Sequence, residues 1–305
     1  MFRRIVCLLL VLLCGAVPCF AEESAPAEAD PAVFPRETYK LGIRNLRVYD
    51  RFETDTLAFT IESFTMEGAR WVLTEIWVQD PARQIRKINA EWGVDLAAPI
   101  DMARQFPEAM LLTNASGYIS KTYPDIPESY PGEPSDYYYT TLGSLVITDG
   151  EILRKLDGVP FYGLALSEDG ISMYRGADIE DVLATQPTQT WAFFEPCAIQ
   201  ENGEEVLPEE GTWPMAEEKH PRTVLARINR NNYVLLHIPY GTKLRGVSLY
   251  RISEFFSEHF TAEWIYNLDG GYSSSLIYRV QKQRTNVRRV VPNVQKIADM
   301  LCFTE

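Results

Sequence analysis

The chain has 305 residues and a formal net charge of -13 at pH 7, from 42 acidic and 29 basic side chains. Nonspecific nucleic-acid binding needs many cationic side chains, and anionic membrane surfaces repel an acidic protein, so this composition excludes both kinds of partner. The length suits one large domain or two small ones. Because the sequence contains no internal repeat and no change of composition near its middle, we expect a single domain. The sequence does not specify an oligomeric state.

The first 21 residues have the features of an export signal. Arg3 and Arg4 precede an apolar run over 5–17, and small residues stand three and one positions before Glu22. Such a run is short for a membrane span, so we predict a signal peptide over 1–21 and a secreted or cell-envelope protein with no span after cleavage. An uncleaved anchor is the alternative. The Glu-, Ala- and Pro-rich residues 22–36 predict a disordered spacer before the folded domain at 37–305.

The cysteines and histidines give no sign of a metal centre. Three of the five cysteines belong to the predicted signal peptide, which leaves Cys197 and Cys302. These two are compatible with one disulfide in an oxidising compartment and equally with two buried thiols. The sequence has no CxxC motif or Cys/His cluster, and its three histidines are not spaced as a metal triad. We therefore expect no structural zinc site.

Short β-prone runs dominate the chain after the spacer. We expect strands over 56–64, 71–78, 84–90, 190–194, 222–228, 233–238, 264–266 and 276–278, and helices over 99–106, 178–184, 249–260 and 293–301. The Asp-Gly pairs at 149–150 and 169–170 predict β-hairpins. Ser248 is expected to cap the helix at 249–260, and Ile297, Ala298 and Leu301 to face inward from the last helix. The predicted fold class is α+β, a mixed, largely antiparallel sheet core with a few packed helices.

The stretch over 266–275 is the most informative about chemistry. An apolar strand leads into Asp269, then Gly270 and Gly271, then three serines at 273–275. Two glycines after a carboxylate allow a left-handed backbone and close approach, and successive N–H groups with serine hydroxyls can bind an anion. The alternative interpretation is an ordinary turn, because Asp-Gly and Gly-Gly are common turn signals.

Two other stretches place polar residues at strand ends. Asn114 ends an apolar strand and precedes Gly117, and the Pro- and Tyr-rich segment 121–139 follows. Long loops of this kind are often functional, and tyrosines there could stack on sugar rings or serve as a surface cover. Arg222 and Thr223 begin another strand. An arginine in this position could bind a phosphate bidentately, or pair with a surface carboxylate.

Five motifs in this order resemble the phosphodiester glycosidase family, which includes the animal lysosomal uncovering enzyme and bacterial exopolysaccharide biosynthesis proteins. The motifs are Asn114 with Gly117-Tyr118; Arg222-Thr223; Gly-Val-Ser-Leu over 246–249; Asn-Leu-Asp-Gly-Gly-Tyr-Ser-Ser over 267–274; and Arg-Val-Val-Pro-Asn over 289–293. The resemblance implies hydrolysis of a sugar-1-phosphodiester to free sugar and a phosphomonoester, in cell-envelope or extracellular glycan metabolism. The implied partner is a phosphorylated glycan or another sugar phosphodiester.

The resemblance also assigns site residues. Arg222 would bind the phosphate, Asp269 would act as nucleophile, base or metal ligand, and Asn114 would orient the sugar or the metal. The expected substrate-binding residues are Gly117, Thr223, Asn267, Gly270, Gly271, Ser273 and Ser274. A divalent cation, Ca²⁺ or Mg²⁺, is compatible with these oxygen ligands. No second carboxylate is indicated by spacing, so both retention and inversion stay open.

Three departures from the family pattern support alternative functions. The chain has Arg-Thr-Val-Leu-Ala at 222–226, Pro-Tyr-Gly at 239–241 and Tyr272 where the family often has Arg-Thr-Ala-x-Gly, Asp-Gly-Arg and a third glycine. A non-catalytic glycan-binding or cell-surface protein on the same scaffold is one alternative, and a metal-dependent phosphodiesterase is another. For the glycosidase, we expect Asn114, Arg222 and Asp269 to share one cleft. Asp269→Asn and Arg222→Ala should each abolish turnover in a folded protein.

Overall fold

The computed structural model describes residues 46–194, 197–240, 246–281, 283–292 and 295–305. The predicted signal peptide at 1–21, the predicted spacer at 22–36 and the first residues of the predicted domain lie outside these ranges. The fold class is α+β, as predicted, with antiparallel strand pairing and short helices. None of the helices in the described residues has the length and apolar character needed to cross a membrane.

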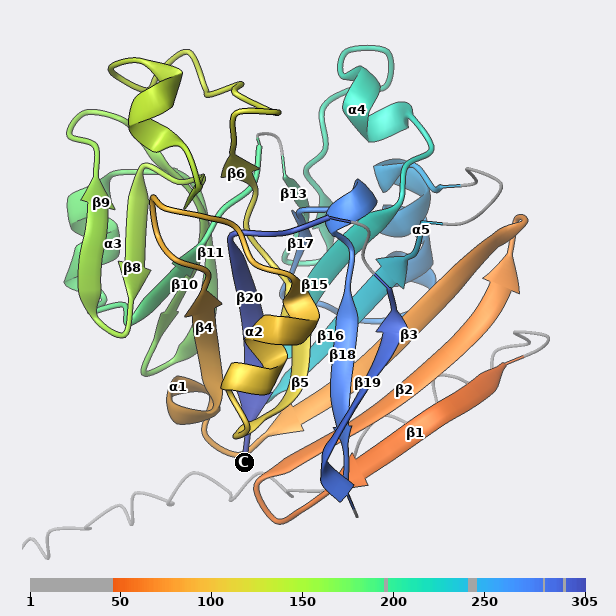
Figure 1. Ribbon diagram of the computed structural model, residues 1–305. Helices are drawn as coiled ribbons and strands as arrows, with labels where there is room; N and C mark the ends of the chain where they lie inside the picture. Colours follow the sequence, from red (N-terminus) through yellow and green to blue (C-terminus); the bar gives the residue numbers. More distant parts are fainter. Residues whose placement is uncertain (1–45, 195–196, 241–245, 282, 293–294) are drawn as a thin grey trace, which may run out of the picture. The chain divides into compact units, whose positions relative to one another are not determined.

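Two large sheets form the centre of the fold (Figure 1). The eight-stranded sheet has the order β1 (Arg47–Glu53), β2 (Leu57–Met66), β3 (Ala69–Val78), β16 (Asn232–Ile238), β15 (Arg222–Asn229), β17 (Trp264–Leu268), β13 (Ala198–Glu201) and β14 (Glu204–Glu205). The five-stranded sheet has the order β19 (Gln283–Val291), β18 (Leu276–Val280), β5 (Ala109–Asn114), β20 (Asp299–Thr304) and β4 (Ile85–Asn89).

Smaller elements lie beside these sheets. A three-stranded sheet contains β11 (Gly170–Ala177), β10 (Phe161–Ser167) and β12 (Gln189–Trp191), and two pairs are formed by β6 (Tyr118–Ile119) with β7 (Thr140–Thr141) and β8 (Leu145–Thr148) with β9 (Glu151–Lys155). The helices are α1 (Pro81–Gln84), α2 (Pro99–Gln105), α3 (Ile179–Ala184), α4 (Pro214–Glu217) and α5 (Leu249–His259), with short 3-10 turns η2 (Pro134–Tyr137) and η3 (Gly271–Ser273). Both predicted hairpins are present, as β8–β9 and β10–β11.

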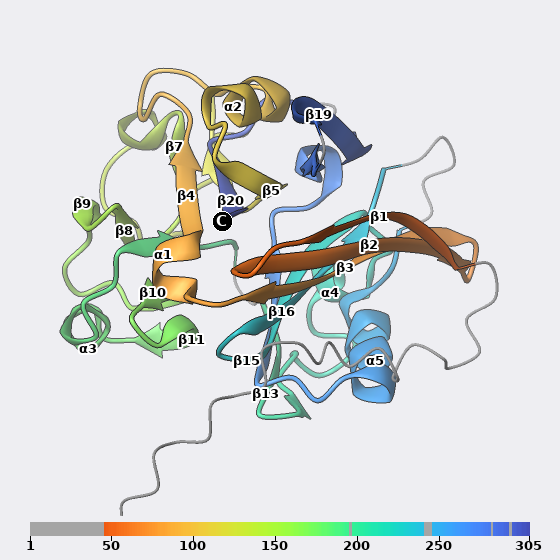
Figure 2. The same cartoon turned by 90° about the horizontal axis from the view of Figure 1, so that it is seen from below.

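The central strands of the eight-stranded sheet are buried on both faces because they are apolar on both sides. Along β15, Leu225 belongs to the core shared with the five-stranded sheet, whereas Val224 and Ala226 belong to the core under α5. Figure 2 shows α5 on one side of this sheet and the strands β5 and β20 on the other. The Ser248 hydroxyl accepts a hydrogen bond from the Arg251 N–H at 3.2 Å, which confirms the predicted helix cap.

The predicted closing helix at 293–301 is wrong. Residues 293 and 294 lie outside the described ranges, and Asp299–Thr304 forms β20, the strand between β5 and β4. The inward-facing residues Ile297, Ala298 and Leu301 are indeed buried, but Met300, Cys302 and Phe303 are buried too. A continuous apolar run is typical of a central strand covered on both faces, and its chance agreement with helical spacing produced the error.

The two remaining cysteines form no disulfide with each other in this structure. Cys197 and Cys302 are both buried, which agrees with the interpretation as two buried thiols. Burial raises the pKa of the Cys302 thiol, which makes its reactive thiolate form scarce. Neither cysteine therefore contributes a disulfide to the stability of the described fold.

Candidate active site

A pocket lies where the two large sheets present the ends of three strands. In the described residues, β5 ends at Asn114, β17 ends at Leu268 and β15 begins at Arg222, and the register pairs Thr223 with Leu268. The cavity has a volume of about 390 Å³. The predicted site residues that line it are Gly117, Arg222, Asn267, Asp269, Gly270 and Gly271. Strand pairing thus brings together segments that are distant in the sequence.

The other predicted site residues, Asn114, Thr223, Ser273 and Ser274, are buried behind the pocket wall. The Oδ1 atom of Asn114 accepts hydrogen bonds from the Ser275 N–H at 2.8 Å and the Thr223 hydroxyl at 3.2 Å. Its Nδ2 donates to the backbone carbonyl of Asp269. Asn114 therefore holds the Asp269 segment in place, and its carbonyl oxygen is already occupied.

Asp269 has its backbone fixed and its carboxylate in the pocket. The Asp269 N–H donates to the Ala115 carbonyl at 2.9 Å, and the Asp269 carbonyl accepts the hydrogen bond from the Asn114 side chain. Burial raises the pKa of Asp269 from 3.8 to about 7, and the charge of Asp299 adds to this, while hydrogen bonds from the Ser273 hydroxyl and the Gly270 N–H act in the other direction. A carboxyl with a pKa near neutrality is suited to proton transfer or nucleophilic attack at physiological pH.

Arg222 is 4% exposed, and its guanidinium is held by three backbone carbonyls. Nε donates to Val247 at 3.3 Å, and Nη2 donates to Met215 at 2.5 Å and to Glu218 at 3.0 Å. Burial lowers the pKa of Arg222 to about 10, with partial compensation from the Glu218 charge, so the group stays cationic at pH 7. Within the described residues Nη1 has no protein partner, which leaves a charged donor for a ligand in the pocket.

The two glycines after Asp269 allow close packing. A Cβ atom on Gly270 would lie 2.7 Å from the Pro221 carbonyl oxygen, and Gly271 has a left-handed φ of +58°. The Gly271 N–H donates to the Pro221 carbonyl at 3.0 Å. This hydrogen bond joins the segment after Asp269 to the segment before Arg222, so the Gly271 N–H is not left for an anion.

Several pocket residues were not predicted from the sequence: Tyr118, Tyr123, Asp125, Phe193, Phe194, Met215, His220, Pro221, Tyr272 and Gln295. Asp125 brings a second carboxylate from the Pro- and Tyr-rich segment, whose unusual composition was the only sequence signal for it. The Tyr118 hydroxyl donates to the Lys296 carbonyl at 3.0 Å, and burial together with the charge of Asp269 raises the pKa of Tyr118. Gln295 donates to the Ser273 hydroxyl at 2.7 Å.

Tyr240 and Tyr272, which belong to two of the three departures from the family pattern, are in contact. The rings of Tyr240 and Tyr272 have centroids 4.8 Å apart at an angle of 50°. Both side chains are exposed, and Tyr272 lines the pocket. The two replacements therefore add a joint aromatic surface at the pocket rim, which is chemistry suited to contact with a sugar ring.

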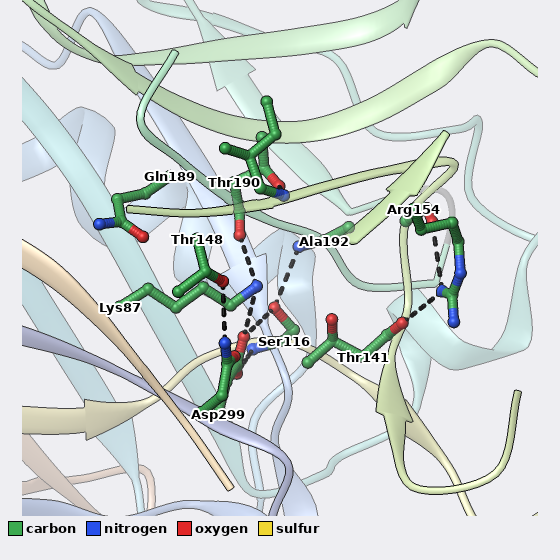
Figure 3. Close-up of polar contacts among 12 residues, drawn as sticks. Lys87, Ser116, Thr141, Thr148, Arg154, Gln189, Thr190, Ala192 and Asp299 are labelled. Carbon is green, nitrogen blue, oxygen red and sulfur yellow. Dashed lines mark hydrogen bonds and ion pairs between the residues drawn. The ribbon is translucent and has the colours of Figure 1, made fainter. Parts of the chain in front are cut away.

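Figure 3 shows a buried ion pair between Lys87 and Asp299. Lys87 Nζ is 3.2 Å from Asp299 Oδ2, and both side chains are almost fully buried. Lys87 also donates to the Thr190 carbonyl at 2.9 Å, and Asp299 accepts from the Ser116 N–H at 2.7 Å and the Ser116 hydroxyl at 2.6 Å. Ser116 stands between Ala115, which binds the Asp269 backbone, and Gly117, which lines the pocket. The ion pair therefore supports the segment that positions Asp269.

The side chains that line the pocket do not provide the oxygen ligands of a calcium site built by the protein alone. Ca²⁺ takes six to eight oxygen ligands. Among the described residues, no group of three or more His, Cys, Asp or Glu side chains is placed to hold a metal ion. The carbonyl oxygen of Asn114, which we expected as a metal or sugar contact, is used inside the protein. Asp125 and Asp269 are the carboxylates that line the pocket in the described part of the chain.

Comparisons with known proteins agree with this architecture. The catalytic domain of zebrafish N-acetylglucosamine-1-phosphodiester alpha-N-acetylglucosaminidase, described as auto-inhibited by its pro-peptide, matches with a TM-score of 0.60 and 16% identity over 85% of this chain and 87% of that one. A hypothetical protein from Synechocystis matches with a TM-score of 0.51 and 13% identity over 85% and 64%. No curated protein sequence is significantly similar to the chain. The sequence model of the phosphodiester glycosidase family matches residues 119–304, and the chain therefore belongs to the phosphodiester glycosidase family.

Proposed function

We propose that this protein is an exported hydrolase that cleaves a sugar-1-phosphodiester to free sugar and a phosphomonoester, in cell-envelope or extracellular glycan metabolism. One observation carries the proposal: a buried cation, Arg222, and a carboxyl with a pKa near 7, Asp269, line the same pocket. Export rests on the signal peptide expected at 1–21, followed by a spacer at 22–36 and a catalytic domain over 37–305.

Arg222 would bind the phosphate of the substrate. Its guanidinium is fixed by three carbonyls before any ligand arrives, so the charge needs no reorganisation when the phosphate carries the bonding electron pair away from the sugar. A phosphomonoester is a good leaving group, and neutralising its charge reduces the need for protonation. This explains how one cation can provide much of the help that the leaving group requires.

Asp269 would act on the opposite side of the anomeric carbon. Above pH 7 its carboxylate can stabilise the positive charge that develops on the sugar, and it can form a glycosyl ester or remove a proton from the attacking water. In both cases water supplies the new hydroxyl of the sugar, and the C–O bond to phosphate breaks. Asp125 or His220, which line the same pocket, would exchange the remaining proton with solvent.

Two alternatives are distinguished by their products. The Tyr240–Tyr272 contact favours a non-catalytic glycan-binding protein as the second candidate, because it adds binding surface where the family pattern differs. A phosphodiesterase that uses Mg²⁺ or Ca²⁺ would break the P–O bond. Since the described side chains of the pocket do not fit a calcium site built by the protein, our proposal assigns no step of the reaction to a metal ion.

The test is hydrolysis of N-acetylglucosamine-1-phosphate methyl ester in water enriched in ¹⁸O, because the zebrafish relative is named for that sugar. The proposal expects free sugar carrying ¹⁸O, together with unlabelled methyl phosphate. Asp269→Asn is the matched inactive control. Label in the phosphate would establish a phosphodiesterase, and binding without turnover of a panel of sugar-1-phosphate methyl esters would establish the glycan-binding alternative. Activity that persists at full rate in EDTA would agree with a reaction that needs no metal.

A further inference from the structure

His220 and Glu218 form a hydrogen-bonded pair beside the pocket. The Nε2 atom of His220 lies 2.7 Å from Glu218 Oε2, and His220 lines the same pocket as Asp269. An ionised carboxylate can only accept a hydrogen bond, so Nε2 carries the proton of the neutral imidazole and Nδ1 carries the lone pair. In the part of the chain that the structure describes, no protein group is hydrogen-bonded to Nδ1. His220 is therefore an oriented imidazole with a nitrogen available to accept a proton.

The backbone around this imidazole is fixed to the rest of the site. The Val247 N–H donates to the His220 carbonyl at 3.0 Å, and the Gly271 N–H donates to the Pro221 carbonyl at 3.0 Å. A Cβ atom on Gly246 would lie 2.1 Å from the His220 carbonyl carbon, so the two segments pack as closely as glycine allows. None of these contacts involves the imidazole, and substitution of this half-exposed side chain should therefore leave the fold intact.

His220 lies on the side of the pocket that we assign to the phosphate. It forms a β-bridge with Val247 and precedes Arg222, the first residue of β15, by two positions. Side chains two residues apart in extended backbone point to the same side. The Glu218 carbonyl accepts from Arg222 Nη2 at 3.0 Å, and the Glu218 carboxylate contacts the imidazole, so one residue orients both groups.

This position matters because Arg222 and Asp269 would act from opposite sides of the anomeric carbon. In a first step an Asp269 carboxylate oxygen bonds to that carbon, and the C–O bond to phosphate breaks with its electron pair on the phosphate. Water then attacks from the face that the phosphate has left. The water oxygen bonds to the anomeric carbon, and the ester bond breaks with its electron pair on Asp269. One water proton must be removed in this second step, and Nδ1 of His220 lies on the side where that proton is released.

Asp125, the other carboxylate besides Asp269 in the pocket lining, lacks such support. It is exposed, and within the described ranges it has no hydrogen bond or ion pair that would orient it. His220 has a fixed backbone and a carboxylate partner that stabilises the imidazolium after proton uptake. We propose that His220 is the general base of a second, deglycosylating step, that Glu218 is its positioning residue, and that the reaction therefore retains the anomeric configuration.

This inference rests on the proposed function, and the stereochemistry of the product tests it separately. The substrate is the α anomer of N-acetylglucosamine-1-phosphate methyl ester, because the name of the zebrafish relative specifies that anomer. Proton NMR during the first minutes of hydrolysis should show the α sugar before it equilibrates in water. Release of the β sugar would overturn the inference and leave the proposed function standing. Absence of hydrolysis by the wild-type protein would overturn the proposed function, and the role of His220 with it.

His220→Ala should slow the second step and leave the first step unchanged. The 4-nitrophenyl ester is used here, because its better leaving group accelerates the first step alone. We expect a burst of 4-nitrophenyl phosphate equal to the enzyme concentration, then a steady rate about 10²-fold or more below that of wild type. Mass spectrometry of the quenched protein should find the sugar on Asp269. Azide attacks without losing a proton, so it should restore turnover and yield the α-glycosyl azide.

Two further variants separate the role of the pair from a general loss of activity. In Glu218→Gln the amide can donate to Nε2 and thereby move the imidazole proton to Nδ1. The steady rate should then fall by a smaller factor than in His220→Ala, with the burst preserved. His259→Gln is the matched control and should change neither phase, since His259 lies 3.9 Å from Glu258 at the end of α5, outside the lining of the pocket.

Two kinetic results would contradict the assignment of the base. One is an equal reduction of the burst and the steady rate in His220→Ala, which would indicate a structural role. The other is accumulation of the sugar on Asp269 in Asp125→Asn but not in His220→Ala, which would assign the base to Asp125.

Discussion

The side-chain amide of Asn114 donates to the backbone carbonyl of Asp269, although 155 positions separate the two residues. This contact joins the end of β5 in one sheet to the residue after β17 in the other. The Ala115 carbonyl accepts the Asp269 N–H from the same segment, so the backbone of Asp269 is held on both sides. The predicted convergence of Asn114 and Asp269 is therefore real, but Asn114 contacts the Asp269 backbone and does not itself line the pocket.

Asn114→Asp should lower kcat with a smaller change in KM. The substitution removes the donor to the Asp269 carbonyl and replaces it with a buried acid, so we expect a loss of unfolding free energy of about 1–3 kcal/mol. Denaturant unfolding and steady-state kinetics measure the two effects. Thr223→Val, which removes only the neighbouring hydroxyl, is the control and should have the smaller effect on kcat. A normal kcat in Asn114→Asp would show that the hydrogen bond from Asn114 to the Asp269 carbonyl has no role in turnover.

Activity should rise with pH through the pKa of Asp269. Because the proposed role needs the carboxylate and burial raises its pKa to about 7, kcat/KM should be about tenfold lower at pH 6 than at its plateau above pH 8. The phosphodiester itself is ionised throughout this range. The measurement is a pH profile on the methyl ester between pH 5 and 9. A profile that falls through pH 7 would instead assign Asp269 as a general acid.

The sequence predicted local features of this fold more reliably than distant contacts. Asp-Gly turns and the Ser248 cap are set by neighbouring residues, and the structure confirms them. Asp125, by contrast, reaches the pocket through the packing of a long loop, and no local spacing connects it to Asp269. The strand at 299–304 was missed because its burial depends on β5 and β4 on either side. The order of motifs identified the family, but strand pairing decided which motif residues line the pocket.

Arg222→Ala should reduce stability as well as turnover, contrary to the expectation that this variant stays fully folded. Its guanidinium satisfies the carbonyls of Met215, Glu218 and Val247, and deletion leaves them without these donors in a largely buried place. We expect a loss of about 3 kcal/mol or more in unfolding free energy. Thermal unfolding measures it. Arg222→Lys keeps the positive charge but lacks the planar guanidinium with its several N–H donors. It should be more stable than Arg222→Ala, while its kcat/KM should still be at least 10²-fold below the wild-type value.

Removing one partner of the buried ion pair should be more harmful than removing both. Lys87→Met leaves the Asp299 carboxylate in the interior without its cation, at a cost of about 3–5 kcal/mol. In the double variant Lys87→Met with Asp299→Asn, the amide oxygen can still accept from Ser116, and we expect recovery of about half of that loss. Denaturant unfolding of the three proteins gives the comparison. Equal stability of the single and double variants would show that the pair is not coupled.

Asp269→Asn should stabilise the protein at high pH and not at low pH. The folded-state pKa of Asp269 lies near 7, above its ordinary value of 3.8, so the native state binds the proton more tightly than the unfolded state does. The wild-type protein therefore loses stability as the pH rises from about 4 through 7, because ionisation is unfavourable in the buried pocket. The variant lacks this ionisation, and its advantage should be about 4 kcal/mol at pH 8 and should largely disappear near pH 4. Unfolding free energies of both proteins at the two pH values measure this difference.

Asp95→Asn is the matched control, since the pKa of Asp95 is lowered by its hydrogen bond with Lys296 and its substitution should not stabilise the protein at pH 8. A stabilisation by Asp269→Asn that is the same at both pH values would mean that the carboxyl is not strained by burial, and the argument that this residue is prepared for catalysis near neutral pH would lose its basis.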